Sequence, residues 1–173
     1  MELIVTCARH FEGETSKEIE GFLRELGDKS PEITITKFSG IITVKTTLCH
    51  TDIIKHVQKK FEEEPWAIRY TMRIIPMFQV VECDISSIAD SAIFQAHKMK
   101  PDETYRITIE KRDSDIKSSE IITSIAEKLP NRVSLENYDW IILIQTLGNM
   151  CGISLVKDED VLSVERLKRA SFE

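Results

Sequence analysis

The hydrophobic period of the first half of the chain changes repeatedly, and this feature constrains the fold more than any other. Residues 2–8 alternate apolar and polar positions and favour β-branched types, which is typical of a half-buried strand. Residues 15–26 place apolar side chains at the spacing of one helix face. Thr15 and Glu18 have the spacing of a capping box at the helix start, and Gly27 stands where a C-cap needs glycine. The pattern predicts a strand followed by a helix.

The next segments extend this pattern. Two β-branched runs, residues 33–36 and 41–44, flank a short link in which Gly40 permits the positive φ of a tight hairpin. A second helical repeat ends at Pro65, and a strand is expected over residues 66–75. The resulting order, β-α-β-β-α-β, predicts a ferredoxin-like domain in which helices cover one face of a four-stranded sheet.

The second half of the chain also changes between strand and helix periods. An extended segment precedes a helix that Asp84 opens, and residues 105–110 alternate as a strand. A polar connection leads to a helix that Pro130 terminates, and residues 132–135 indicate a short strand. A last hairpin turns at Gly148. The fold class expected for the whole chain is α+β.

Two segments near the C-terminus complete the domain prediction. Residues 140–144 are apolar on both faces, which predicts a central strand covered on both sides. Residues 157–173 combine dense charge with a weak helical pattern, which indicates a frayed helix or mobile tail. The predicted division is a ferredoxin-like domain over residues 1–76, an α/β domain over 77–156 and a charged C-terminal tail over 157–173.

The composition is that of a folded protein with one or two small domains. The chain has 173 residues, 42% of them hydrophobic, with only six Gly and five Pro. Glu2 stands where a secretory signal needs a basic residue, and no apolar run is long enough to span a bilayer, so a cytoplasmic protein is expected. No cysteine belongs to a CxxC pair, which favours reduced, mostly buried thiols at Cys7, Cys49, Cys83 and Cys151.

Net charge limits the kind of partner. The chain has 23 Lys and Arg against 29 Asp and Glu, and the resulting charge of −6 has the wrong sign for a general binder of polyanions. Residues 66–100 are less acidic than the rest, with four basic and three acidic side chains. Any contact with a nucleic acid must therefore be local.

A family resemblance is carried by a strand that ends in basic residues, a helix, a Val-x-Leu strand and a Gly-Ile-Ser hairpin. These are residues 105–112, Ser118-Ser119 with the helix to Leu129, residues 133–137 and residues 151–155. In this order and spacing they resemble a THUMP domain, from about residue 77 to 156. The preceding unit is similar to the N-terminal ferredoxin-like domain that accompanies THUMP in RNA-modifying proteins.

The resemblance implies a role in tRNA modification. In that family the two domains bind tRNA, THUMP recognises the single-stranded 3′ end of the acceptor stem, and a separate catalytic domain modifies a distant nucleotide. A stand-alone chain of this layout resembles the adaptor that delivers tRNA to the cytidine acetyltransferase forming N4-acetylcytidine. We therefore expect a non-catalytic protein whose partners are tRNA and a separate modifying enzyme, with no membrane involved.

The same resemblance places an RNA groove beside the start of the helix near Ser118. Its residues are Lys98, Lys100, Arg106, Lys111, Arg112, Lys117, Ser118 and Ser119. A helix N-terminus offers unpaired backbone N–H groups and nearby cations add charge-assisted bonds, which together suit phosphate oxygens. Asp113 and Asp115 reduce the positive field of this loop, so weak, salt-sensitive binding is expected. From the residues alone, a solvated loop with surface ion pairs is the competing interpretation.

Two side-chain expectations accompany the groove. Lys111 and Arg112 should both be exposed, so that charge reversal there leaves the fold intact. Tyr105, Tyr138 and Trp140 are expected to be core residues rather than platforms on which bases stack.

No catalytic motif accompanies these residues. The sequence has no GxGxxG after a strand, no GxxxxGKS phosphate loop, no GxSxG elbow and no HExxH pair, so neither cofactor nor metal is expected. A small-ligand sensor and an acylphosphatase-like enzyme remain as alternatives, because fold alone does not fix function. The enzyme requires a convergent Arg and Asn near the end of the first strand, where the sequence offers only Arg9.

Overall fold

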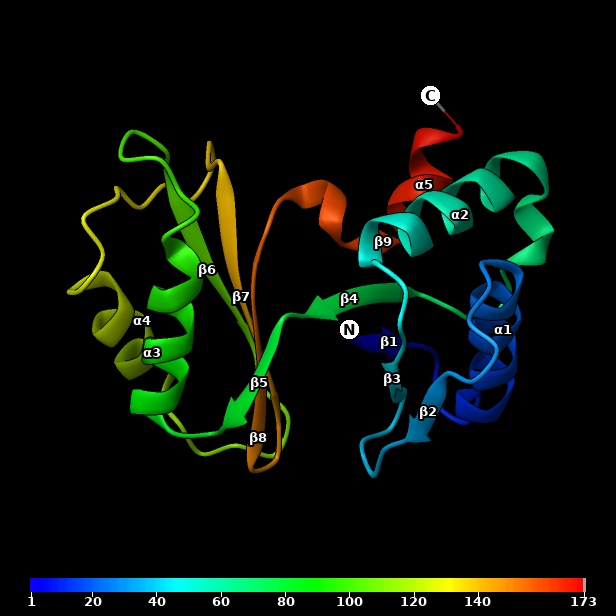
Figure 1. Ribbon diagram of the computed structural model, residues 1–173, viewed down its shortest axis with the longest axis horizontal. Coiled ribbons are helices and arrows are strands. Elements are labelled where there is room, and N and C mark those ends of the chain that lie inside the picture. Colours follow the sequence, from blue (N-terminus) through cyan, green and yellow to red (C-terminus); the bar gives the residue numbers. More distant parts are fainter. Residues whose placement is uncertain (173) are drawn as a thin grey trace. The chain divides into compact units, whose positions relative to one another are not determined.

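The computed structural model describes residues 1–172, which form two compact units (Figure 1). The first unit joins Met1–Pro76 to residues 160–172, and the second contains Met77–Glu159. Each unit has its own sheet and its own cluster of buried apolar side chains. Both units mix helices with mostly antiparallel strands, so the fold is α+β, as predicted.

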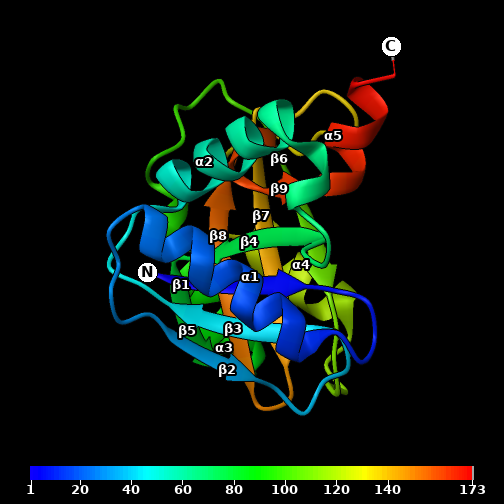
Figure 2. The ribbon, with the colours of Figure 1, turned by 90° about the vertical axis from the view of Figure 1, so that its right-hand side faces the viewer.

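The first unit follows the predicted β-α-β-β-α-β order and adds two elements from the C-terminal end. Its elements are β1 (Glu2–Thr6), α1 (Glu12–Glu25), β2 (Glu32–Ile35), β3 (Ile41–Lys45), α2 (His50–Glu63), the 3-10 helix η1 (Pro65–Ala67), β4 (Arg73–Met77), β9 (Leu162–Ser163) and α5 (Val164–Ala170). The strand order is β2-β3-β1-β4-β9, and Figure 2 shows α1 and α2 crossing this sheet. Val5 of β1, Ile19 of α1 and Val57 of α2 share one buried cluster.

Helix α1 begins earlier than its local sequence predicts. Its first residue is Glu12, so Thr15 lies inside the helix, fully buried, and its hydroxyl donates to the carbonyl oxygen of Phe11 at 2.7 Å. The Glu18 carboxylate accepts backbone N–H groups from Arg69 at 2.8 Å and Thr71 at 2.9 Å. The predicted capping box is therefore wrong, because Glu18 satisfies a distant loop rather than its own helix start.

The end of α1 agrees with the sequence. Gly27 has φ of 102°, and its N–H donates to the carbonyl of Arg24, while that of Asp28 donates to Leu23, which is a Schellman arrangement. The Asp28 carboxylate then accepts the hydroxyl of Thr46 at 2.5 Å. This hydrogen bond, with a second one from the backbone of Ser30, holds the pKa of Asp28 below its ordinary value.

The strand predicted over residues 66–75 is shorter than expected. Pro65 opens the 3-10 helix η1, in which Trp66 is 67% exposed, and β4 begins only at Arg73. The strand starts late because the backbone N–H groups of residues 69–71 donate to the Glu18 carboxylate rather than to a neighbouring strand.

The second unit is a four-stranded sheet with two helices. Its elements are β5 (Gln79–Glu82), α3 (Ile85–Ala96), β6 (Tyr105–Glu110), α4 (Ser118–Ala126), β7 (Trp140–Leu147) and β8 (Met150–Val156). The strand order is β5-β8-β7-β6, in which β6 and β7 are parallel and the other pairs are antiparallel. Asp84 caps α3, as predicted, by accepting the backbone N–H of Ser87 at 2.8 Å. The β7–β8 turn has Gly148 at φ of 64°, as the predicted hairpin requires.

Strand β7 occupies the central position that its apolar sequence predicts. Ile142, Leu143 and Ile144 follow one another along it and each is at most 5% exposed, so both of its faces are buried. The short strand predicted over residues 132–135 is wrong. Among the described residues this segment makes a single β-bridge, between Val133 and Tyr105, and Leu135 is largely exposed.

The C-terminal segment differs from the predicted frayed helix or mobile tail. Leu162 and Ser163 pair antiparallel with β4 as strand β9, and the hydroxyl of Ser163 caps α5 by accepting the N–H of Arg166. Leu162 and Val164 are buried with the core of the first unit. The sequence pattern is weak because only two residues form the strand; Glu173 lies outside the described residues.

The cysteines are free thiols, but they are not uniformly buried. Cys7 and Cys151 are buried, Cys83 is partly buried and Cys49 is exposed. Burial and the neighbouring Cys83 raise the pKa of the Cys151 thiol to about 12. Within residues 1–172, every helix is too short or too polar to cross a bilayer.

Two glycines of the first unit give opposite expectations for stability. Gly40 has φ of 74°, and a Cβ there would meet the carbonyl oxygen of Cys7 at 2.5 Å, whereas a Cβ on Gly21 of α1 would meet nothing within 4 Å. Gly40→Ala should lower the free energy of unfolding by at least about 2 kcal/mol. Gly21→Ala should raise it by about 0.5–1 kcal/mol. Urea unfolding measures both; equal effects would contradict the strained turn.

Candidate nucleic-acid interface

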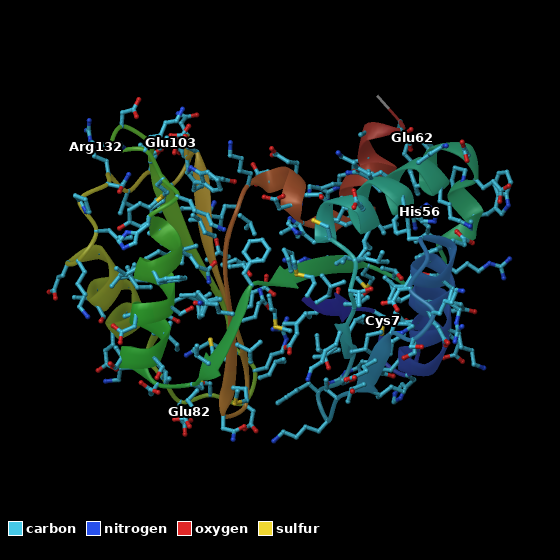
Figure 3. All side chains as sticks on the ribbon, viewed as in Figure 1. Cys7, His56, Glu62, Glu82, Glu103 and Arg132 are labelled. Carbon is cyan, nitrogen blue, oxygen red and sulfur yellow. The ribbon has the colours of Figure 1, made fainter. Side chains whose placement is uncertain are left out.

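The predicted groove residues divide between the two ends of β6. Lys98 and Lys100 precede this strand, whereas Lys111 and Lys117 follow it. Strand β6 has six residues, and at about 3.3 Å per residue its ends are roughly 17 Å apart. Figure 3 places Glu103, which precedes β6, near one end of the second unit and Glu82, the last residue of β5, near the other. The structure therefore does not bring all eight residues into one groove.

Several elements converge where β5, β6 and β7 end, a region that we call the carboxyl edge. It consists of loop 111–117, the first turns of α3 and α4, and the β7–β8 turn. The Sγ atom of Cys83 lies 3.4 Å from the Oγ atom of Ser114, which joins loop 111–117 to the start of α3. The N–H of Gly148 donates to the carbonyl of Arg112 at 2.9 Å, which joins the loop to the hairpin.

The two helices that begin at the carboxyl edge differ in their capping. At α3, the Asp84 carboxylate accepts the N–H of Ser87, and hydrogen bonds from the side chain and then the backbone of Ser87 keep the pKa of Asp84 below its ordinary value. At α4, the N-cap residue is Lys117, which forms no side-chain capping hydrogen bond. The backbone N–H groups of Ser118 and Ser119 therefore stay available for an external acceptor, together with the positive end of the helix dipole, whereas that of Glu120 donates to the carbonyl of Lys117 at 3.1 Å.

Cations flank this uncapped helix start. Lys117 is exposed and, among residues 1–172, forms no ion pair. Lys111 is exposed as predicted, and its ammonium closes the loop by donating to the carbonyl of Ile116 at 3.0 Å. Ser118 is half-buried and Ser119 is exposed at the helix start. Three exposed carboxylates, those of Asp113, Asp115 and Glu120, oppose the two lysines, so the field at the carboxyl edge is mixed.

Arg112 does not have the exposed side chain that the sequence analysis expects. Its side chain is 16% exposed, and its guanidinium pairs with Glu110 at 3.1 Å and donates to the amide oxygen of Gln145 at 2.6 Å. Its backbone N–H donates to the hydroxyl of Thr146 at 2.8 Å. The side chain turns inward because β7 offers it a buried amide acceptor. Arg112 therefore fixes the loop in place, and Lys111 and Lys117 are the accessible cations.

The opposite end of β6 and β7 holds a second set of cations. The guanidinium of Arg106 lies 5.2 Å from the ring centre of Tyr138 and donates to the carbonyl of Leu135. The ammonium of Lys157 lies 4.8 Å from the ring of Trp140. Tyr105 is fully buried as predicted, whereas Tyr138 and Trp140 are only partly buried. These cation–aromatic pairs were not predicted from the sequence, because Tyr138 precedes β7 and Lys157 follows β8, where strand alternation assigns no face.

The remaining predicted cations have no role at the carboxyl edge. Lys98 follows α3 and lies over the ring of Phe78 at 5.7 Å. Lys100 is exposed in the turn before β6, and its backbone N–H and carbonyl bind Glu103 and Asn131. Both belong to the end of the unit that also holds Arg106.

Comparison with protein families supports the fold described for the second unit. Residues 84–156 match the family model of the THUMP domain, which confirms the domain predicted from the sequence. The matched segment runs from the N-cap of α3 to the end of β8, so it contains the whole carboxyl edge. A comparison with curated proteins gives no match.

Solved structures share the fold at low sequence identity. The PH1313 protein of Pyrococcus horikoshii Ot3 is 19% identical over 90% of this chain, with a TM-score of 0.68. TrmN of Thermus thermophilus is 8% identical over 90% of the chain, and a 4-thiouridine synthetase in complex with RNA and ATP is 12% identical over 94%, both with TM-scores of 0.57. The chain covers 54%, 45% and 41% of these three proteins respectively, about half of their length.

The inward position of Arg112 gives a stability prediction. Arg112→Ala leaves Glu110 without its ion pair and removes the guanidinium donor to Gln145, and should lower the free energy of unfolding by about 1.5–3 kcal/mol. Lys111→Ala, at the adjacent exposed position, should change it by less than about 0.5 kcal/mol. Thermal and urea unfolding compare the two variants. An Arg112→Ala protein as stable as Lys111→Ala would show that the guanidinium is not an anchor.

Proposed function

We propose that this chain binds tRNA through the carboxyl edge of its THUMP domain and presents it to a separate RNA-modifying enzyme. The observation that carries the proposal is the uncapped start of α4 beside two accessible lysines, within the segment that matches THUMP. A protein of the same fold, the 4-thiouridine synthetase, has been solved in complex with RNA. The proposal assigns a similar contact to this chain.

The chemistry of the carboxyl edge suits a nucleic-acid backbone. Backbone N–H groups at a helix start donate to phosphate oxygens, and the ammonium groups of Lys111 and Lys117 add charge-assisted bonds. The hydroxyl of Ser119 offers a further donor to phosphate or to a ribose 2′-OH. The 3′ end of the acceptor stem is single-stranded, so it can follow a short edge of the sheet.

The finer proposal concerns the partner. We assign the chain a non-catalytic role, because its sequence contains no phosphate-loop, dinucleotide, nucleophile-elbow or zinc motif. The enzyme that it serves is proposed to be the acetyltransferase that forms N4-acetylcytidine. The division of labour follows from the resemblance: this chain supplies affinity and orientation, and its partner supplies the chemistry.

Charge reversal at the carboxyl edge tests the tRNA contact. Lys111→Glu with Lys117→Glu should weaken tRNA binding at least about tenfold and reduce the slope of log K against log salt by about 1.4 to 1.8, because two phosphate contacts are lost. Filter binding or fluorescence anisotropy at several salt concentrations measures both quantities. Both side chains are exposed, so circular dichroism should show an unchanged fold.

Lys98→Glu with Lys100→Glu is the matched control, because it makes the same charge change in the same unit at the opposite end of β6. This control should keep most of the wild-type affinity. Loss of binding in the control and not in the Lys111/Lys117 variant would move the RNA contact to the end that holds Arg106, Tyr138 and Trp140. Wild-type protein that does not bind tRNA at all would refute the proposed function.

Purification of the chain from cells with its bound partners tests the adaptor role. A cytidine acetyltransferase should co-elute, and the purified enzyme should acetylate tRNA faster when this chain is added. The Lys111→Glu, Lys117→Glu variant should still co-elute with the enzyme but fail to accelerate it, because it no longer delivers tRNA. Co-elution of a metabolic enzyme without RNA would favour the small-ligand sensor instead.

A further inference from the structure

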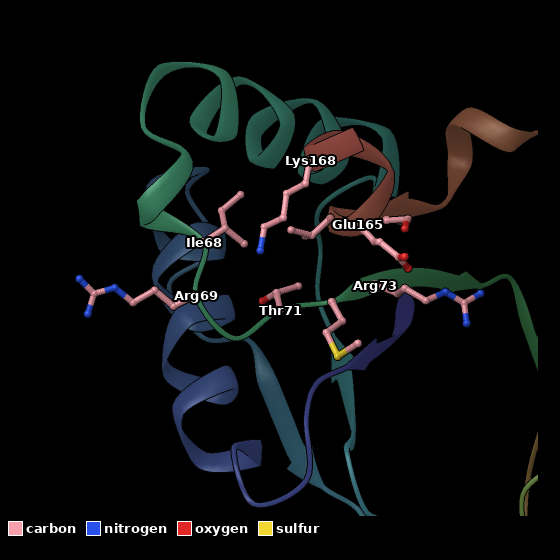
Figure 4. A pocket seen from close by; sticks show the side chains of 9 residues that line it. Ile68, Arg69, Thr71, Arg73, Glu165 and Lys168 are labelled. Atoms are coloured by element: carbon pink, nitrogen blue, oxygen red, sulfur yellow. The ribbon is translucent and has the colours of Figure 1, made fainter. Parts of the chain in front are cut away.

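The first unit contains a pocket that lies outside the candidate nucleic-acid interface. The pocket lies between residues 68–73, which lead into β4, and the first turns of α5, and has a volume of about 240 Å³. A water molecule occupies about 30 Å³ in the liquid, so the pocket has room for an oxyanion with several waters. Figure 4 shows its walls, which include Ile68 on one side and side chains of α5 on the other.

A polar group without a partner lies at the bottom of this pocket. Thr71 is 3% exposed, and its hydroxyl oxygen has no hydrogen-bond partner among the described residues. Leaving a buried hydroxyl unpaired costs stability, and such groups are uncommon in folded proteins. The backbone N–H of Thr71 is already satisfied by the Glu18 carboxylate, so the hydroxyl is the free donor.

A cation points at this hydroxyl from the opposite wall. In Figure 4 the side chain of Lys168 descends from α5 into the pocket, and its ammonium faces the hydroxyl of Thr71. The two groups are not hydrogen-bonded to each other, and Lys168 forms no ion pair among residues 1–172. An oxyanion between them would accept a hydrogen bond from the hydroxyl and a charge-assisted bond from the ammonium.

The charged side chains around the pocket have both signs. Arg69 and Arg73 contribute to its lining with their stems, and their guanidinium groups point outward in Figure 4. Two carboxylates oppose these cations, but both are engaged. Glu165 pairs with Arg169 at 2.5 Å, and Glu18 accepts backbone N–H groups from residues 69–71.

We infer that this pocket is a phosphate-binding subsite and that its occupant is a backbone phosphate of RNA. The shared chemistry is that of a phosphate group, whose oxygens accept from the hydroxyl of Thr71 and the ammonium of Lys168. The identification of the phosphate as part of RNA rests on the proposed tRNA-binding function. The existence of the phosphate site does not depend on that function.

The site itself is tested with inorganic phosphate. Phosphate titrated into the ¹⁵N-labelled full chain at constant ionic strength should shift the amide signals of Thr71, Met72 and Val164 to saturation, and chloride should not. Thr71→Val with Lys168→Ala should abolish the saturation. Thr71→Val alone should leave the melting temperature unchanged or raise it, because it removes an unpaired hydroxyl. A clear fall in its melting temperature would show that the protein already uses this hydroxyl internally, and would overturn the site.

The source of the phosphate is tested with tRNA. The Thr71→Val, Lys168→Ala variant should bind tRNA about fivefold or more weakly than wild type, with a salt slope smaller by about 0.7 to 0.9. Arg166→Ala is the matched control, since it removes one cation from the same helix outside the pocket without releasing Glu165, and it should keep the wild-type slope.

The phosphate titration and the tRNA-binding measurement together distinguish failure of this inference from failure of the proposed function. Loss of tRNA binding in the Lys111/Lys117 variant with wild-type binding in the Thr71/Lys168 variant would overturn the RNA phosphate here and leave the carboxyl edge intact. Saturable phosphate binding without tRNA binding by wild-type protein would support the subsite but assign it to a free phosphate or phosphorylated small molecule. Absence of both effects would overturn the subsite.

Discussion

The parallel pairing of β6 with β7 is the constraint on which the second unit and its candidate site depend. Parallel strands cannot be joined by a tight hairpin, so the chain must cross over between them, and α4 lies in that crossover. The crossover returns the chain to the start of β7, which leaves the end of β6 and the start of α4 together at one edge. Strand β5 runs in the same direction, so α3 also begins there. The topology thus places two helix starts at the carboxyl edge, and only α3 has a side-chain cap.

Most of the fold could be predicted from the sequence because its longer elements have clear periods. The apolar run at residues 140–144 specified a central strand, and Gly27 and Gly40 marked turns that need positive φ. The failures are places where a distant group decides the local structure. Glu18 has capping-box spacing but binds the loop at residues 69–71, and β9 exists only because the edge of β4 pairs with it. No local pattern contains that information.

The candidate site was less predictable than the fold for a related reason. A resemblance identifies the domain, and alternation along β6 assigns side chains to a face, but neither says which cations remain accessible. Arg112 is next to Lys111 in sequence, yet the amide of Gln145 and the carboxylate of Glu110 draw its guanidinium inward. Lys98 and Lys100 are also exposed lysines, but the length of β6 separates them from loop 111–117. Pairing and strand direction, rather than the number of basic residues, decide where a phosphate can be held.

The importance of where the cations lie, rather than how many there are, makes the proposed binding of tRNA compatible with an acidic chain. At about 0.1 M salt, exposed charges more than about 10 Å apart are largely screened, so the net charge of −6 matters less than the groups beside each phosphate. Several basic side chains are already paired, among them Arg24 with Glu20 and Lys60 with Glu25. Lys117 and Lys168 have no such partner in the described chain. Each lies beside uncharged hydrogen-bond donors, which are the backbone amides at the start of α4 for Lys117 and the hydroxyl of Thr71 for Lys168. Because hydrogen bonds from fixed donors are directional, affinity gained in this way favours a defined position of the RNA over general attraction to it.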